Sequence, residues 1–360
     1  MSTTERPELV SSGAGLASTV AAETHGELGE GAQAVRARGY WEGVWMRFRR
    51  DKFAIAGAVW IALLILVGFI GAPIAAHFLG HGPDKPFSGG VDANTVLPVG
   101  PLTWVSDQPY PGAVPAPGQH FDHTLFILGA DSQLGRDEFL RLLYGTQTSL
   151  EVAIGATIFA MILGILMGSM AGFYGGWTDT VISRITEIVM AFPVLLFVIA
   201  LASTAGEHLD NITFGFLGKG VMTLVFVLGI FGWFYPARII RAQVLSLREK
   251  EFVEAARMIG TSDGKIIRSH ILPHLVAPII VYSTLVVASN ILAEAGLSFL
   301  GLGIKEPTPS WGALLSQGPN YYLTQPWLMV WPGLAVLLAT LAFNLLGDGM
   351  RDAFDPRSSG

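Results

Sequence analysis

The sequence contains no cysteine, which excludes a disulfide framework, a thiolate metal site and redox chemistry at sulfur. It is also poor in charge: Asp, Glu, Lys and Arg make up only 14% of the 360 residues, against about 25% in soluble domains. Hydrophobic residues, in contrast, make up 51%. This balance excludes an ordinary soluble protein and is typical of a chain that lies in a membrane.

The chain also lacks the common catalytic and nucleotide-binding motifs. It contains no HExxH, no GxSxG and neither GxxxxGKS nor GxxxxGKT. The stretch LGKG at 217–220 fails the last pattern, because Gly220 replaces the Ser or Thr and the upstream glycine is missing. We therefore expect no catalytic residue, no metal site, no bound cofactor and no P-loop for ATP in this chain.

Hydrophobic residues gather in runs long enough to cross a bilayer, which takes about 20 helical residues. We predict an all-α membrane protein with six transmembrane helices. The predicted spans are at about 53–79, 149–170, 180–203, 216–235, 274–295 and 327–346. A short amphipathic helix within 128–150 is expected to lead into the second span, and a glycine-rich turn at 171–179 to follow it.

The other segments differ in composition. Residues 1–35 have almost no large apolar side chains and predict a disordered tail. Residues 36–80 combine a basic, aromatic amphipathic stretch with the first span. A Pro/Gly-rich insertion at 81–128 shows no strong periodicity, and its length points to a function or to packing on a partner. The core with five spans is 129–350, and 351–360 form a C-terminal tail.

Lysine and arginine predict the orientation of the chain. With the N-terminus taken as cytosolic, most of the 22 basic residues lie on the cytosolic side. The opposite side holds only Lys85, Arg136, Arg141, Lys219 and Lys305. Because basic residues accumulate on the cytosolic side of membrane proteins, we expect both termini in the cytosol.

A polar segment at Glu251–Pro273, EFVEAARMIGTSDGKIIRSHILP, lies between two hydrophobic runs. It predicts two short helices around a turn, with Gly260 ending the first helix and Thr261 or Ser262 capping the second. On the first helix, Glu254 and Arg257 are expected opposite an apolar stripe. The stripe consists of Phe252, Ala255, Ala256 and Ile259, which recur at helical spacing.

This segment resembles the coupling segment of ABC-importer permeases, whose pattern is Glu-Ala-Ala, three residues, Gly, nine residues, then Ile-x-Leu-Pro. The matching residues are Glu254, Ala255, Ala256, Gly260, Leu272 and Pro273, whereas His270 stands where the pattern has Ile. Further stretches resemble the second membrane subunit of the dipeptide/oligopeptide branch. They are RFRRDKFAIAG (47–57), LGRD (134–137), LSFLGLGIKEPTPSWG (297–312) and AFNLLGDGMRDAFDPR (342–357). That branch usually has Pro where Glu306 stands.

The resemblance implies a type I ABC-importer permease fold in a bacterial cell membrane. It implies a sister permease that shares the translocation path, two cytosolic ATPases that dock on the coupling segments and use ATP and Mg²⁺, and an extracytoplasmic solute-binding protein. The expected solute is a di- or oligopeptide, with nickel or another small solute as the alternative. No nucleic acid is expected as a partner.

Polar residues in the predicted spans are candidates for function, because they are costly in a membrane. Glu294 is expected either on the solute path or in a pair with the sister subunit, and Asn290 either on that path or in an interhelical hydrogen bond. Arg184 and Glu187 are expected to pair with each other.

Two further groups have alternatives of their own. Pro307, Pro309 and Trp311 are expected to meet the binding protein or to anchor a helix end at the interface. Gly164 and Gly168 predict a packing face of small residues.

Two other classes of membrane protein fit less well. An ion-gradient transporter would predict inverted repeats and acidic residues at mid-membrane, yet acids near span centres are scarce and the coupling segment would have no purpose. An intramembrane hydrolase would need a nucleophile–base pair or metal ligands within the spans, and the sequence offers neither.

Overall fold

The computed structural model describes residues 40–114, 120–191, 193, 196–200 and 220–355. The chain divides into two units, Met1–Met46 and Arg47–Gly360, and the second contains nearly all of the described structure. The predicted tail at 1–35 lies outside the described residues. The amphipathic stretch predicted after it contains helix α2 (Tyr40–Phe48), on which Trp41 and Trp45 are exposed.

Among the described residues, four helical segments are long and apolar enough to cross a membrane. They are Lys52–Leu79, Glu138–Tyr174, Asp263–Phe299 and Trp327–Phe354. The first consists of α3 (Lys52–Leu66), a π-helical turn (Val67–Gly71) and α4 (Ala72–Leu79), the second is α5, and the fourth is α14. The third ends in α12 (Val276–Phe299).

A fifth span exists if a bent pair of helices is one span. This pair is α8 (Val221–Gly232) and α9 (Phe234–Leu247), which meet at an angle of 41°. In that case the fourth predicted span continues well beyond its expected end near 235. The third predicted span, at about 180–203, lies partly outside the described residues, and α6 (Gly176–Ala191) occupies its first part.

The predicted amphipathic helix and second span are not two elements. They form one helix, α5, of 37 residues from Glu138 to Tyr174. Asp137 begins it by accepting hydrogen bonds at Oδ1 from the backbone N of Phe139 (2.9 Å) and Leu140 (3.4 Å). The predicted glycine-rich turn follows at Gly175 and Gly176, where φ is +67° and +52°.

Small residues let helix α5 approach α9 closely, as the sequence predicted for Gly164 and Gly168. A Cβ atom on Gly164 would lie 2.6 Å from the Pro236 Cβ, and one on Gly168 would lie 2.5 Å from the Ala237 O. Gly172 extends the stripe by another turn, since its Cβ would lie 2.8 Å from the Val244 Cβ. The prediction of a packing face is confirmed.

The insertion at 81–128 corrects the all-α prediction. Strands β1 (Thr103–Ser106) and β2 (His123–Phe126) pair in antiparallel register over a small core of Phe87, Val105, Phe126 and Ala130. Four-residue strands are too short to show a clear alternation of apolar and polar residues, so the sequence pattern did not predict them.

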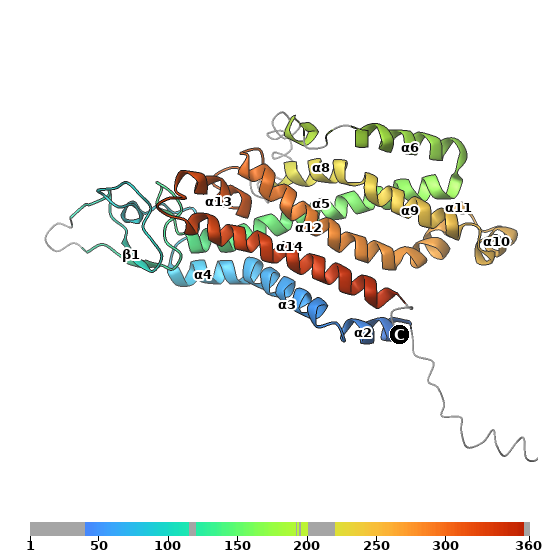
Figure 1. The fold of residues 1–360 in the computed structure, drawn as a ribbon, viewed down its shortest axis with the longest axis horizontal. Coiled ribbons are helices and arrows are strands. Elements are labelled where there is room, and N and C mark those ends of the chain that lie inside the picture. The colour runs from blue at the N-terminus through green and yellow to red at the C-terminus, as the bar shows by residue number, and fades with distance from the viewer. Residues whose placement is uncertain (1–39, 115–119, 192, 194–195, 201–219, 356–360) are drawn as a thin grey trace, which may run out of the picture. The chain divides into compact units, whose positions relative to one another are not determined.

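In the unit formed by residues 47–360, the two ends of the helix bundle differ (Figure 1). Helices α10 (Glu251–Met258) and α11 (Asp263–Ile266) lie at one end, which we call the α10 end. Strand β1, helix α13 (Trp311–Gln317) and the first turns of α5 lie at the other, the sheet end. Short helical turns complete the fold at Ser88–Gly90, Ile267–Ile271, Leu272–Leu275 and Gly318–Asn320.

Candidate functional site

The polar segment Glu251–Pro273 forms the two short helices around a turn that its sequence predicts. Helix α10 ends in a Schellman motif, in which the Thr261 N donates to the Ala256 O (3.0 Å) and the Gly260 N to the Arg257 O (2.9 Å). Gly260 adopts φ +77°, which residues with a side chain rarely adopt. Ser262 precedes α11 at the N-cap position, although its side chain makes no capping hydrogen bond.

The inward face of α10 differs from the predicted stripe. Val253 and Ala256 are the buried residues of this helix, and of the stripe only Ala256 lies on this face. They pack in a hydrophobic cluster to which three other helical segments contribute. The other buried members are Phe173, Ile240, Val244, Ile266, Ile271 and Leu275.

Arg257 also lies on the inward side, where the sequence pattern had placed it opposite the packing face. Its guanidinium carbon lies 5.2 Å from the centroid of the Phe173 ring, at the end of α5, in a cation–π contact. A helical pattern of eight residues cannot predict this contact, because Phe173 lies on another helix, 84 residues earlier in the chain.

The outward face of α10 carries large apolar side chains that no other described part of the chain covers. Met258 is 82% exposed and Ile259 is 81% exposed. Glu254, Ala255 and Gly260 are exposed on the same segment. Apart from Gly260 and its two chain neighbours, no described residue has an atom within 4 Å of the position that a Gly260 Cβ would occupy. Farther along, Leu272 is half-buried and Pro273 is exposed in the turn that leads to α12.

Glu294 lies in a buried hydrogen-bond network near the sheet end, and its expected contact with the solute path or the sister subunit stays a prediction. Its side chain is 0% exposed, and its carboxylate accepts hydrogen bonds from the hydroxyls of Ser149 (2.8 Å) and Ser298 (2.7 Å). Each hydroxyl accepts a backbone N–H in turn, from Trp311 (3.2 Å) and Ile304 (3.1 Å) respectively. Glu294 therefore joins α5, α12 and the loop before α13.

Asn290 forms the interhelical hydrogen bond that was one of its two expected roles. Its Nδ2 donates to the Thr157 Oγ1 at 3.0 Å, so α12 and α5 are joined a second time. The Asn290 side chain is buried within this chain and does not line an open path in it.

The three residues considered for binding-protein contact have different environments. Pro307 is exposed, Pro309 is buried, and Trp311 is 0% exposed in the central hydrophobic cluster. In this chain Trp311 is therefore packed inside the bundle, and of the three residues Pro307 is the exposed one. Its position at the first residue of α13, after the N-cap Ser310, turns its side chain toward the bundle.

The sheet end also contains a buried ionic network that the sequence did not predict. Arg136 and Arg141 share the carboxylate of Asp131, at 2.7 Å and 2.9 Å, and all three side chains are almost wholly buried. Both arginines also contact Glu306, at 2.6 Å and 3.3 Å, and Arg141 reaches Asp84 at 2.9 Å. The signals available in the sequence were the LGRD motif and the unusual Glu306.

Among the carboxyl groups in and beside this network, Asp137 and Glu306 have pKa values shifted in opposite directions. Burial raises the pKa of Asp137 to about 6, against the hydrogen bonds from Leu140 and Phe139. Burial also acts to raise the pKa of Glu306, but the hydrogen bond from Arg136 and the charge of Arg141 outweigh it, so the pKa of Glu306 is lowered. Within the described ranges, no group of three or more His, Asp or Glu side chains is placed to hold a metal ion.

Comparison with known proteins identifies the family. Residues 164–360 match the family described as binding-protein-dependent transport system inner membrane component. Residues 39–87 match the N-terminal TM domain of oligopeptide transport permease C. This chain belongs to the permeases of binding-protein-dependent ABC importers. The resemblance inferred from the coupling segment and the other motifs is therefore confirmed.

Individual relatives cover most of the permease. The glutathione transport system permease protein GsiD of Escherichia coli O157:H7 is 36% identical over 320 residues, which cover 89% of this chain and 91% of GsiD. The dipeptide transport system permease protein DppC of Alkalihalophilus pseudofirmus is 43% identical over 223 residues, or 62% of this chain and 69% of DppC. A putative peptide transport system permease protein of Brucella suis is 40% identical over 233 residues, covering 64% of this chain and 73% of the relative.

Proposed function

We propose that this permease is one of two non-identical, six-span subunits of an ATP-driven importer for di- or oligopeptides in a bacterial inner membrane. Both termini and the α10 end lie in the cytosol, and the sheet end lies outside. The names of the relatives support a peptide solute, because dipeptide, glutathione and peptide permeases are among them. Nickel or another small solute is the alternative.

The outward face of α10 is the observation that supports docking of a cytosolic ATPase. Met258 and Ile259 would be costly to leave in water, and a partner surface that covers them would gain apolar burial. Ala255 and Gly260 leave the backbone open to close approach. Glu254 adds an exposed carboxylate at the edge of this face.

The inward face of α10 supports a role in transmitting motion. Its cluster contains Phe173 from α5, Ile240 from α9 and Leu275 from the start of the α12 segment. A displacement of a docked α10 therefore acts on three long helices at once. In this proposal the ATPases use ATP and Mg²⁺, a solute-binding protein delivers the peptide, and the sister permease completes the path between two alternating states.

The docking role can be tested with a matched pair of variants. Ile259→Asp places a charge on the outward face of α10, and Leu323→Asp does the same at an equally exposed position, 81%, near the sheet end. We expect Ile259→Asp to lose most of the ATPase that co-purifies in mild detergent, and Leu323→Asp to retain it. The sister permease should remain bound in both variants.

Two outcomes would contradict the proposal. Equal ATPase recovery with both variants would place docking elsewhere than on α10. Purification of the wild-type chain without a sister permease or a P-loop ATPase, together with solute movement driven by an ion gradient in liposomes, would favour a secondary transporter instead.

A further inference from the structure

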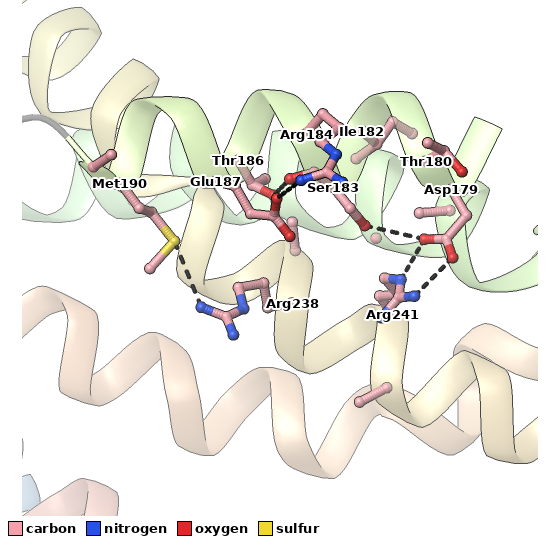
Figure 2. Close-up of a pocket in the computed structure, with 15 residues that line it drawn as sticks. Asp179, Thr180, Ile182, Ser183, Arg184, Thr186, Glu187, Met190, Arg238 and Arg241 are labelled. Atoms are coloured by element: carbon pink, nitrogen blue, oxygen red, sulfur yellow. Dashed lines mark hydrogen bonds and ion pairs between the residues drawn. The ribbon is translucent and has the colours of Figure 1, made fainter. Parts of the chain in front are cut away.

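A polar cleft opens between helices α6 and α9, with α5 beneath it (Figure 2). Its volume is about 790 Å³, within the range of about 300–1,000 Å³ that holds small ligands in proteins. Its small lining residues, which leave this space open, are Gly168, Ala171, Ala191, Ala237 and Ala242.

Two of the three arginines in the cleft already have carboxylate partners. Arg241 forms an ion pair with Asp179 through two nitrogens, one of them Nη2 at 2.7 Å from Oδ2. Arg184 pairs with Glu187 at 2.8 Å, as the sequence predicted. Both pairs are drawn in Figure 2, and each cancels the charge of one arginine.

Arg238 differs from the other two arginines. Among the described residues, its side chain donates only to the Met190 Sδ, at 3.7 Å, and a thioether is a weak acceptor. Figure 2 shows Arg238 between α6 and α9, on the side of the cleft that α9 forms. The five N–H donors of a guanidinium match the paired oxygens of a carboxylate or a phosphate.

The hydroxyl groups that line the cleft donate their hydrogen bonds to other groups of α6, so they add no free donor beside Arg238. Ser183 donates to the Asp179 Oδ1 (3.2 Å), Thr186 to the Ser183 O (2.7 Å) and Thr180 to the Gly176 O (2.9 Å). Each hydroxyl proton is therefore committed within α6. The charges of the lining residues leave one unit of positive charge, and that charge is on Arg238.

We propose that this cleft binds an oxyanion, a carboxylate or a phosphate, through Arg238. Two sources provide this chemistry: the C-terminal carboxylate of a peptide solute and the phosphate of an anionic lipid headgroup. The first source rests on the proposed function, since it makes the cleft part of the route by which the solute leaves. The second does not depend on it, because basic pockets between membrane helices also hold lipid headgroups.

The test uses the complete importer: this chain, its sister permease and the ATPases are reconstituted in vesicles, and the solute-binding protein is supplied on the side from which the peptide is taken up. Uptake is measured for a dipeptide and for the same dipeptide with an amidated C-terminus, in vesicles of phosphatidylcholine with and without phosphatidylglycerol. The variants are Arg238→Gln, which removes the charge, and Arg238→Lys, which keeps it. Arg50→Gln serves as the control, because it removes an exposed guanidinium outside the cleft.

The solute source predicts that the wild type prefers the free carboxylate, with a KM roughly tenfold lower than for the amide. Arg238→Gln should abolish this preference, Arg238→Lys should restore much of it, and Arg50→Gln should leave it unchanged. The lipid source predicts that phosphatidylglycerol stimulates the wild type and Arg238→Lys but not Arg238→Gln, with both dipeptides affected equally.

The proposal is overturned if Arg238→Gln keeps the wild-type response both to the amide and to phosphatidylglycerol. It is also overturned if Arg238→Gln releases the sister permease, because the cleft would then be filled by that subunit. A wild-type complex that takes up neither dipeptide with ATP would overturn the proposed function, and the lipid measurement, read as ATPase activity, would still decide the inference.

Discussion

The α10 end and the sheet end of this permease differ in the energetically unfavourable groups that they contain. At the α10 end, Met258 and Ile259 are apolar and exposed. At the sheet end, Asp131, Arg136 and Arg141 are charged and buried. The exposed apolar surface is costly until a partner covers it, whereas the buried charges satisfy one another within the chain. The α10 end therefore leaves apolar side chains exposed in this chain, whereas the buried charges of the sheet end are paired within it.

Removing a buried charge at the sheet end should have the largest effect on stability. Arg141→Met takes away the cation that Asp131, Glu306 and Asp84 share, and leaves Asp131 with one partner instead of two. We expect a loss of about 3–5 kcal/mol in stability, because a broken buried pair leaves an uncompensated charge. The measurement is thermal unfolding of the purified permease.

An exposed pair at the same end provides the control for this measurement. Lys85 and Asp107 lie 2.7 Å apart with side chains 43% and 41% exposed. Lys85→Met should cost no more than about 1 kcal/mol. If the Arg141 and Lys85 variants unfolded at the same temperature, the sheet end would not depend on its buried network.

A smaller effect on stability, one that depends on pH, is expected from Asp137. Its pKa in the folded protein is about 6, above the ordinary value near 4. The folded state therefore holds a proton that the unfolded state releases, and stability falls as pH rises from about 4 to 6. Asp137→Asn keeps an N-cap side chain without this loss.

The Asp137→Asn variant should therefore be more stable than the wild type by about 3 kcal/mol at pH 8. The difference should shrink below pH 6 and disappear near pH 4. Unfolding curves across this pH range provide the check, and a difference that does not change with pH would contradict the assignment to Asp137.

The smallest effects are expected from two exposed glycines at the α10 end. Neither Gly260 nor Gly264 has an atom within 4 Å of its missing Cβ, but only Gly260 has a positive φ, +77°. Gly260→Ala should destabilise by about 1 kcal/mol. Gly264→Ala, in helix α11, should stabilise by up to about 1 kcal/mol. Thermal unfolding should show that the two variants shift the unfolding temperature in opposite directions. Two shifts of the same sign would argue against the proposed role of the positive φ at Gly260.

Local features of both ends were predictable from the sequence, and contacts between distant segments were not. Gly260 and the stripe of Gly164 and Gly168 follow from spacing, because turn chemistry and close helix packing depend on near neighbours. The contact of Arg257 with Phe173 joins separate helices, and so does the ionic contact of Arg136 with Glu306, 170 residues away. A pattern along one segment contains no information about such partners.

Burial of polar residues was the second limit of the sequence analysis. Glu294 was expected at a solute path or a subunit contact because a carboxylate in a span is costly, yet two serine hydroxyls satisfy it inside this chain. Ser149 lies 145 residues before Glu294, so the sequence pattern around Glu294 could not predict this contact. Trp311 was likewise expected at an interface, because the loop before it gave no indication that α13 folds back into the bundle.

Helix α5 places the two ends on a single rod. Its 37 residues give a length of about 55 Å at about 1.5 Å per residue, nearly twice the hydrocarbon thickness of a bilayer of about 30 Å. Arg141, in its first turn, belongs to the ionic network, and Phe173, in its last, carries the ring under Arg257. A shift of the rod along its axis would therefore reach both faces of the membrane at the same moment, without a relay of rearranging side chains between them.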